Sequence, residues 1–202
     1  ISTEETRYYL NGIYLHAAKS GKVDMLRAVA TDGHRLARFE MPLPDGAKGM
    51  PGVIVPRKAV SEIRKLVDES SDAVKVSLGE TRIRLAFDGV VLTSKLIDGT
   101  FPDYERVIPQ QNDKLMGVRP KDFKDAVDRV STIAKDQSRA VKMALSEGTL
   151  TLSASGQDTG TATEEIEARY AGGAIEIGFN SRYLLDIAEQ IKGEEAEFAM
   201  SD

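Results

Sequence analysis

The chain of 202 residues contains no cysteine and no tryptophan, and only 6% of its residues are aromatic. Without cysteine it forms neither disulfides nor thiolate zinc sites, which is typical of a cytoplasmic protein. No apolar run approaches the ~20 residues of a membrane-spanning helix, and no signal peptide is recognisable. We therefore expect a cytoplasmic protein with no membrane partner. Because the sequence begins at Ile1 rather than Met, we also expect a piece of a longer protein.

Sequence motifs for catalysis are missing as well. The only histidines are His16 and His34, and there is neither a Gly-x-Ser-x-Gly string nor a phosphate loop. No cluster of metal ligands is evident. We expect a non-catalytic protein with no cofactor and no metal. The alternative is a metal-free hydrolase or transferase built around Asp32, His34 and Arg35, which would need a nucleophile that the sequence does not offer.

The net charge is -5, and a pI near 5.2 is unusual for a nucleic-acid-binding protein. This objection concerns the average charge and not its distribution, because an acidic protein can still present one basic surface. The hydrophobic fraction of 41% is sufficient for packed cores. The length allows one large domain or two of ~100 residues.

The first hundred residues are predicted to be mostly strands. Asn11-Gly12 predicts a hairpin that joins residues 6–10 to 13–15, and Asp32-Gly33 predicts another between residues 25–30 and 36–40. A loop is expected at 41–52 and a helix from Pro56 to about Val67. The other strands expected in this half are residues 53–55, 74–78, 83–87 and 90–95.

The second half is predicted to alternate strands and helices after a polar linker at residues 110–114. Pro120 begins a helix that ends near Ala134, and Asn180 is a candidate cap for a helix over residues 181–191. A small polar loop is expected at 156–163. The strands expected here are residues 115–118, 141–145, 150–154, 166–170, 175–178 and 196–200, with a turn at Glu147-Gly148.

A strand followed by a helix and further strands recurs along the chain, beginning near Ile54, Gly117 and Gly178. This repeat predicts an α+β protein of pseudo-symmetric modules, with helices on one face of antiparallel sheets. The helix expected at 57–67 has one apolar face at helical spacing. Its opposite face is the clearest basic surface in the sequence, formed by Arg57, Lys58, Arg64 and Lys65.

Five strings of residues together resemble one protein family. They are Arg7–Gly12 (RYYLNG), Thr31–Ala37 (TDGHRLA), Ile54–Lys58 (IVPRK), Phe101–Val107 (FPDYERV) and Ile175–Asn180 (IEIGFN). Their order and approximate spacing are similar to those of the bacterial DNA polymerase sliding clamp, the β subunit of the replicative polymerase. The similarity extends over essentially the whole chain.

This resemblance implies the DNA-clamp fold, in which repeated modules place antiparallel sheets outside and helices along the interior of a ring. Residues 1–107 would be the second, central domain without its N-terminal strand and helix. Residues 108–202 would be the third, C-terminal domain without its C-terminal end. With the first domain also missing, we expect that this chain alone does not close a ring.

The resemblance also implies a processivity factor that encircles duplex DNA and performs no chemistry. Its expected partners are duplex DNA, the catalytic subunit of the replicative polymerase, the clamp loader and other proteins that carry a clamp-binding motif. The intact protein would be a head-to-tail homodimer. The alternative is a scaffold that binds peptides without contacting DNA.

Three sets of residues are carried over from the family. The peptide-binding groove would consist of Leu10, Thr31, Gly33, His34, Arg35, Leu36, Pro102, Arg106 and Val107. The DNA-facing residues would be Arg7, Tyr8, Tyr9, Arg57, Lys58, Arg64 and Lys65, although Glu4 close by would repel phosphate. The dimer contact would include Thr132 and Ile133, together with the strand from Val141 to Leu145. In the groove, leucine and valine would supply apolar walls, while arginine stems would lie along apolar ligand groups.

Overall fold

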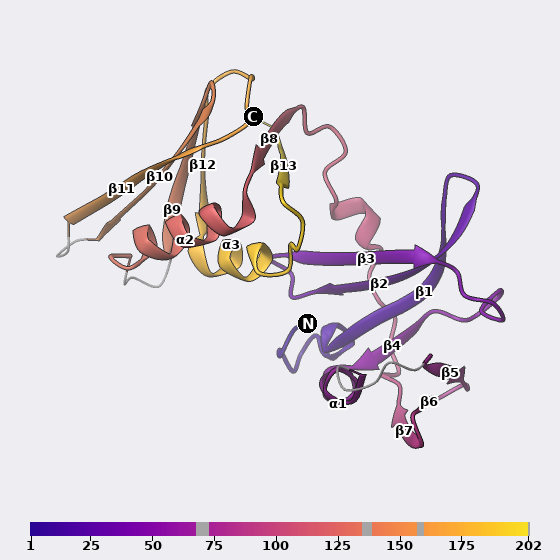
Figure 1. Cartoon of the computed structure of the whole chain (residues 1–202). Helices are drawn as coiled ribbons and strands as arrows, with labels where there is room; N and C mark the ends of the chain where they lie inside the picture. The colour runs from indigo at the N-terminus through magenta and orange to yellow at the C-terminus, as the bar shows by residue number, and fades with distance from the viewer. Residues whose placement is uncertain (68–72, 135–138, 157–159, 202) are drawn as a thin grey trace. The chain divides into compact units, whose positions relative to one another are not determined.

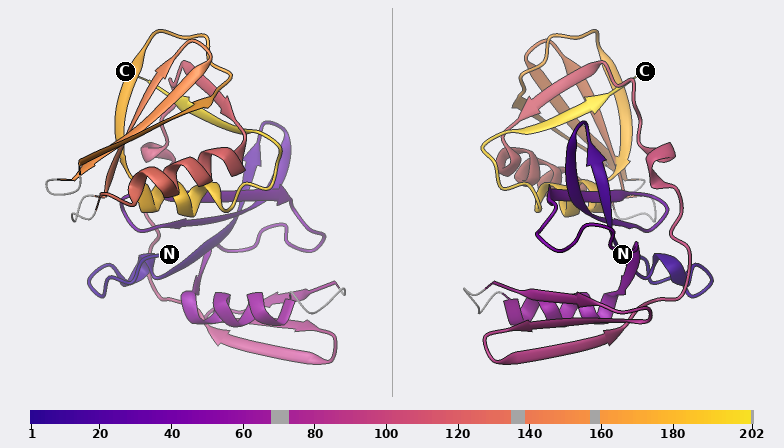
Figure 2. Two further views of the ribbon diagram at one scale, coloured as in Figure 1. Left: turned by 60° about the vertical axis from the view of Figure 1, so that its left-hand side comes forward. Right: turned by 90° about the vertical axis from the view of Figure 1, so that its right-hand side faces the viewer.

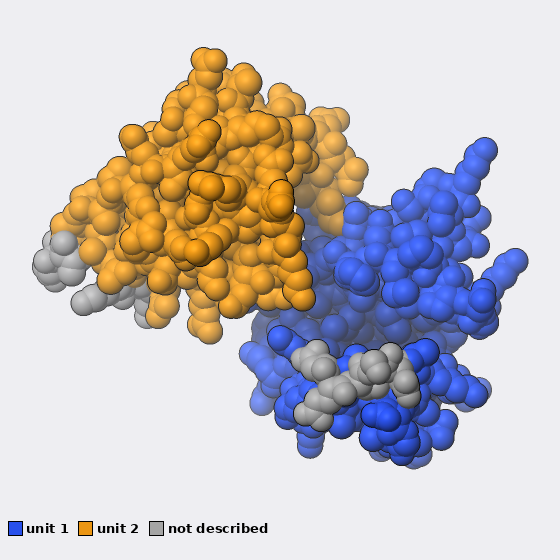
Figure 3. Space-filling model, viewed as in Figure 1, with its two compact units in different colours: residues 1–107 blue, residues 108–202 orange. Residues whose placement is uncertain are grey.

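The computed structural model describes residues 1–67, 73–134, 139–156 and 160–201. The chain divides into two compact units, Ile1–Val107 and Ile108–Asp202, coloured blue and orange in Figure 3. Both units are α+β and combine antiparallel sheets with helices. None of the helices in the described part of the chain is long and apolar enough to cross a membrane.

Unit 1 begins with a short 3-10 helix, η1 (Tyr8–Leu10), followed by a four-stranded antiparallel sheet (Figure 1). The strands are β1 (Gly12–Ser20), β2 (Val23–Thr31), β3 (Leu36–Pro42) and β4 (Val53–Pro56), in the order β3-β2-β1-β4. The hairpin predicted at Asp32-Gly33 is confirmed, since β2 and β3 pair from Thr31 and Leu36 outward.

The hairpin predicted at Asn11-Gly12 is wrong. Residues before Asn11 form η1, in which the amide of Leu10 donates to the carbonyl of Arg7 at 2.9 Å. Gly12 instead starts β1 and faces Pro56 of β4. A side chain at Gly12 would clash with the carbonyl of Val55, so the pairing with β4 requires a glycine there. A distant strand therefore overrides a local turn signal.

The second layer of unit 1 consists of α1 (Arg57–Val67) and a three-stranded sheet, β5 (Lys75–Leu78), β6 (Arg82–Phe87) and β7 (Val90–Lys95). Strand β6 alternates between buried Ile83, Leu85 and Phe87 and exposed arginines. Its buried side chains pack against the apolar face of α1, which lies along this sheet in Figure 2. The alternation with period two thus assigns one face of the sheet to the core and the other to solvent.

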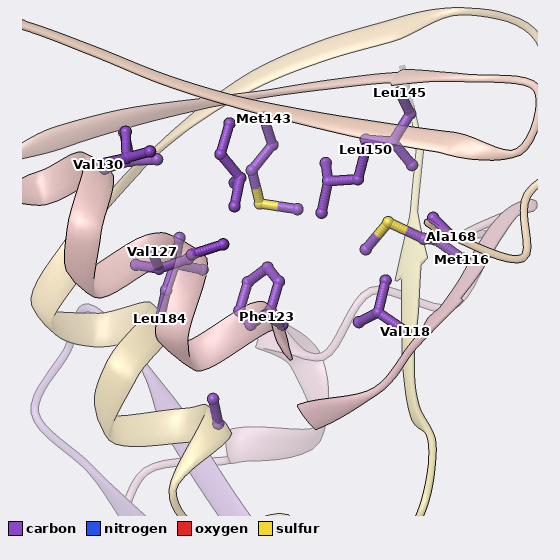
Figure 4. Packing of buried hydrophobic residues seen from close by; sticks show 14 of the residues in the cluster. Met116, Val118, Phe123, Val127, Val130, Met143, Leu145, Leu150, Ala168 and Leu184 are labelled. Carbon is purple, nitrogen blue, oxygen red and sulfur yellow. The ribbon is translucent and has the colours of Figure 1, made fainter. Parts of the chain in front are cut away.

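Unit 2 has one continuous core between two helices and two sheets. Its four-stranded sheet consists of β9 (Ala140–Ser146), β10 (Thr149–Gly156), β11 (Gly160–Glu167) and β12 (Ile175–Asn180), in the order β11-β10-β9-β12. A second sheet pairs β8 (Lys114–Val118) with β13 (Ala196–Met200). The helices are α2 (Pro120–Ser131) and α3 (Ser181–Ala188). Figure 4 shows Phe123 and Val127 of α2 pointing toward Met143 and Leu150 of the sheet.

Three predictions for unit 2 need adjustment. The polar loop expected at 156–163 is partly strand, because β11 begins at Gly160 and pairs with β10; residues 157–159 lie outside the described residues. The strand expected at 166–170 ends at Glu167. Both helices end about three residues early, at Ser131 and Ala188. Asn180 does cap α3, since its Oδ1 accepts from the amide of Arg182 at 3.0 Å.

Candidate functional site: an apolar pocket beside the β2–β3 loop

A pocket of about 380 Å³ opens in unit 1 beside the loop that joins β2 to β3. It is lined by Arg7, Tyr9, Leu10, Thr31, Gly33, His34, Arg35, Leu36, Pro102, Asp103, Tyr104 and Val107. The structure therefore brings together all the predicted groove residues except Arg106. These residues come from three separate stretches of the sequence, which η1, the β2–β3 loop and the segment around η2 (Tyr104–Val107) place around one hollow.

The β2–β3 loop is held by the carboxylate of Asp32. Its Oδ1 accepts from the amides of His34 and Arg35, both at 3.0 Å, and its Oδ2 accepts from Nε of Arg35 at 3.1 Å. Burial opposes ionisation, but these donors outweigh it and hold the pKa of Asp32 below its usual value. Since both of its oxygens already accept hydrogen bonds, Asp32 shapes the loop and is poorly placed to act as a general base.

Gly33 gives the loop its tight turn and lets another side chain approach. Its φ of +88° lies in the left-handed region that favours glycine. A Cβ at this position would lie 2.5 Å from Nη1 of Arg7, so the guanidinium packs directly over the glycine backbone. The hydroxyl of Thr31 donates to the carbonyl of Arg35 at 2.8 Å and closes the base of the loop.

Arg7 is thus a wall of the pocket, a position that the sequence did not predict. Its Nε donates to Glu4 at 2.7 Å, and its Nη2 lies 3.4 Å from the carbonyl of Asp32. The hydrogen bond from Arg7 lowers the pKa of Glu4. Arg7 was expected to face DNA, but Glu4 already offsets its charge here.

The opposite wall is the segment that leads out of unit 1 through η2. Tyr104 is buried, and its hydroxyl meets Nε2 of His16 at 3.1 Å and Nη1 of Arg27 at 3.2 Å. Phe101 stacks on Tyr14 with ring centroids 4.9 Å apart, and Tyr14 stacks on His16 at 4.5 Å. Aromatic packing and hydrogen bonds therefore fix this segment to the sheet of unit 1.

Arg27 is the charged centre of this attachment and is only 7% exposed. Its Nε donates to Glu40 at 2.7 Å, and its Nη1 donates to Glu105 at 2.6 Å. The hydrogen bonds to Tyr104, Glu40 and Glu105 raise the pKa of Arg27, against the effect of burial. Sequence analysis missed this residue. A charged side chain within the apolar stretch Met25–Val29 was the available signal, since an arginine there must find partners inside the fold.

The pocket is suited to binding an apolar segment of another chain. Leu10, Leu36, Pro102 and Val107 provide apolar surface, and Val107 is 69% exposed at the rim. Backbone groups of the β2–β3 loop and nearby guanidinium groups can orient a bound backbone. Arg106 does not line the pocket; its side chain is 83% exposed and pairs with Asp103 at 2.8 Å.

The described part of the chain was expected to lack a metal site, and the side chains that could form one are scattered. No group of three or more His, Asp or Glu side chains could hold a metal ion among the described residues. The hydrolase alternative required Asp32 as an acid or base, and that carboxylate is used by the loop. The geometry therefore favours a binding site.

The four predicted cations of α1 are all exposed, while Ala59 on the other face is buried. Lys65 pairs with Glu62 at 3.0 Å on this exposed side. Tyr8 is 52% exposed and meets Tyr9 edge to face with centroids 5.8 Å apart. Tyr9 lines the pocket, so the tyrosine pair links η1 to the site.

The residues expected at a dimer contact lie just after α2. Thr132 is exposed, and its hydroxyl donates to the carbonyl of Asp128 at 3.1 Å; Ile133 is partly buried against the core. In the neighbouring strand β9, Val141, Met143 and Leu145 point into the core of unit 2. Only the outward residues of that strand are free to face solvent or a partner.

Comparison with known proteins identifies the family to which this chain is similar. Residues 1–103 match the central domain of the DNA polymerase III beta subunit, and residues 105–202 match its C-terminal domain. The chain is 52% identical over 202 residues to the beta sliding clamp of Caulobacter vibrioides, and 36% identical over 201 residues to that of Escherichia coli. All of this chain but only 54% of the Caulobacter protein is covered, so the chain spans about half the length of its relatives.

Solved structures with a similar fold are also sliding clamps. A DnaN sliding clamp from Bartonella birtlesii bound to griselimycin is 56% identical, with a TM-score of 0.94 over 100% of this chain and 54% of that one. A sliding clamp from Pseudomonas aeruginosa is 39% identical, with a TM-score of 0.92. The fold is thus the α+β DNA-clamp fold. The chain belongs to the DNA polymerase III beta subunit family, of which it holds the central and C-terminal domains.

Proposed function

We propose that the full-length protein to which this chain corresponds is a sliding clamp, the processivity factor of bacterial DNA replication. It encircles duplex DNA in the cytoplasm and performs no chemistry itself. The observation that carries the proposal is the pocket beside the β2–β3 loop, because its walls include eight of the nine residues that the family resemblance assigns to a peptide groove. In this function the pocket tethers the polymerase catalytic subunit, the clamp loader and other proteins with a clamp-binding motif.

The peptide-binding part of this proposal can be tested on the full-length protein, in which the C-terminal end that this chain lacks would complete the groove. A labelled peptide of the Gln-x-x-Leu-Phe type should bind at roughly micromolar affinity, about 8 kcal/mol, which permits exchange of partners. The variant Leu36→Asp places a charge on the apolar wall and should abolish the change in fluorescence polarisation. Phe39→Asp is the matched control, because Phe39 is an exposed apolar residue on the same strand and does not line the pocket. Equal binding by the two variants would rule out the pocket as the peptide site.

Substitutions at the pocket rim should reduce peptide affinity by different amounts. His34→Ala and Val107→Ala remove lining side chains and should weaken the peptide. Arg106→Ala was also expected from the family resemblance to weaken it. Because Arg106 does not line the pocket and its side chain is largely exposed, its loss should have a smaller effect than loss of His34.

DNA contact is proposed for the exposed cations of α1, together with Tyr8. Phosphate contacts by lysine and arginine carry no base information, which suits a protein that slides. Replacing Arg57, Lys58, Arg64 and Lys65 with alanine in the full-length protein should speed loss of loaded clamps from linear DNA, or impair loading. Peptide binding should remain unchanged. Loading and retention equal to the parent at low salt would show that α1 does not face DNA.

A scaffold that binds peptides without DNA contact is the second candidate, and the net charge of -5 favours it. The two candidates differ in salt dependence. A clamp should lose DNA binding steeply as salt rises, without sequence preference, whereas a peptide scaffold should show no DNA binding at any salt concentration.

Head-to-tail dimerisation of the full-length protein completes the proposal. Thr132 and Ile133 lie beside α2, which also packs against the sheet near edge strand β11. Light scattering should find a dimer at micromolar concentration, and Ile133→Asp should shift it toward monomer. A monomeric parent protein would contradict the ring.

A further inference from the structure

The outward face of the sheet β5-β6-β7 carries four exposed cations that the pocket and α1 do not use. They are Lys75, Arg82, Arg84 and Lys95, and we call them the sheet cations. The opposite face of this sheet is apolar and packs against α1 (Figure 2). The sheet cations therefore lie on the far side of a two-layer unit from the basic face of α1.

The strand register places the sheet cations in one band. Arg82 of β6 lies directly opposite Lys95 of β7, and Arg84 follows two residues along β6 on the same face. Lys75 of β5 lies opposite Ala86, which is two residues further along. Each such step along a strand is about 7 Å, so the band crosses all three strands diagonally.

Among the described residues, none of the four sheet cations forms an ion pair; the nearest carboxylates along the chain, Glu80 and Asp88, lie in the turns on either side of β6. Two of them, Arg82 and Lys95, are like charges directly opposite each other, an arrangement that destabilises a sheet. In a chain with a net charge of -5, four unneutralised cations on one small face indicate an anionic ligand.

The other side chains on this face indicate which anion it suits. Arg84 is flanked by exposed Ser77 on β5 and Thr93 on β7, its partners across the sheet. Arginine, lysine, serine and threonine are the side chains that contact DNA phosphates. The largest apolar side chain that the register places on this face is Val91, so the face offers none of the aromatic anchors that protein interfaces and single-stranded nucleic acids use.

We propose that the sheet cations form a second DNA-binding surface, which contacts the phosphate backbone of duplex DNA outside any DNA that α1 contacts. Because the two basic faces lie on opposite sides of the same layer pair, one straight duplex cannot meet both. The surface is independent of the peptide pocket. It therefore offers a place for a second duplex segment, such as DNA beyond the one that the ring encloses.

The test is a salt titration of duplex binding by this chain, followed by fluorescence anisotropy of a labelled DNA. In one variant all four sheet cations become glutamine. In a charge-matched control, the exposed Lys19, Lys22, Arg38 and Lys48 of the same unit become glutamine. Measured in a chain whose four α1 cations are already replaced, so that only the sheet surface can bind, the sheet variant should bind about a thousandfold more weakly at low salt, and the slope of log K against log salt should fall by about three.

The control should retain the affinity of the parent, and its salt slope should stay within about one unit of the parent's slope. A third variant that lacks only the four cations of α1 should still bind duplex at the sheet surface, as expected for two separate surfaces. Far-ultraviolet circular dichroism of all variants should match the parent. If the sheet variant binds duplex as the control does, the proposal is overturned, even if loss of the α1 cations abolishes binding.

Two further probes distinguish the ligand class. A single-stranded oligonucleotide should bind the sheet face more weakly than duplex, because the face lacks stacking side chains. A poly-glutamate peptide should not compete with duplex at equal charge concentration. If instead the sheet variant loses poly-glutamate binding but keeps duplex binding, the surface is a docking site for an acidic protein, and the DNA proposal is wrong.

Discussion

The two units use different means to hold the same kind of α+β layers together. Unit 2 has one continuous apolar core, in which Phe123, Met143 and Leu150 are fully buried. Unit 1 has a smaller cluster around Ile83, Leu85 and Phe87, and it attaches its exit segment through Arg27, Tyr104 and two carboxylates. The unit with the larger core is held by apolar burial. The unit with the pocket also relies on polar contacts, which can be removed one at a time.

The largest expected effect is a loss of stability from a substitution in the core of unit 2. Phe123→Ala should destabilise it by about 4 kcal/mol, through lost burial and the remaining cavity. Chemical denaturation followed by the fluorescence of a probe attached to unit 2 would measure the loss. Phe123→Leu keeps most of the volume and should cost much less. Equal effects of the two substitutions would show that the core tolerates a cavity there.

A smaller loss of stability is expected from a substitution in the polar contacts that attach the exit segment of unit 1. Arg27→Met should destabilise unit 1 by about 2 kcal/mol, because Glu40 and the Tyr104 hydroxyl lose a buried donor. It should also weaken binding of the Gln-x-x-Leu-Phe peptide. Arg27 does not line the pocket, but it holds Tyr104, which does. Isothermal calorimetry would measure peptide binding, and denaturation would measure stability. The control is Arg106→Met, because its exposed ion pair with Asp103 should contribute little to either quantity.

Acid should loosen the β2–β3 loop that lines the pocket. The pKa of Asp32 is lowered in the folded state, so its contribution is present above the usual carboxyl pKa of about 4 and is lost as pH falls through the lowered value. Asp32→Ala should cost about 1 kcal/mol at neutral pH, as for loss of other side-chain caps on backbone amides. In the parent, the protection of the His34 and Arg35 amides against exchange, relative to the intrinsic rate at each pH, should fall in acid. In Asp32→Ala these two amides should be unprotected throughout the pH range, and an unchanged protection profile would contradict the role of Asp32.

The smallest expected effect is a gain in stability. Lys95→Gln removes one of the two like charges that face each other across β6 and β7, and should stabilise unit 1 by a few tenths of a kcal/mol at low salt. The gain should vanish at high salt, because the repulsion is screened. Lys48→Gln, in the exposed loop between β3 and β4, is the control and should show neither effect.

Local sequence patterns predicted most of the fold. The strands, the β2–β3 hairpin and the Asn180 cap follow from apolar periodicity and from residues with specific turn or capping chemistry. Errors occurred where distant partners decide the outcome. Asn11-Gly12 has the composition of a hairpin, but pairing of Gly12 with Pro56 takes the strand elsewhere. Residues 160–163 look like a polar loop, and they form a strand because β10 supplies their hydrogen-bonding partners.

By itself the sequence determined the α+β class, the basic face of α1 and, through family resemblance, most of the pocket walls. Only the tertiary structure decided that Arg7 packs over Gly33, that Arg106 pairs with Asp103 outside the pocket lining, and that Arg27 joins Tyr104 across 77 positions of sequence. The reason is physical. Periodicity and turn chemistry act between neighbours in the chain, whereas the partner of a buried charge is set by which strands pair, and those strands can lie anywhere in the sequence.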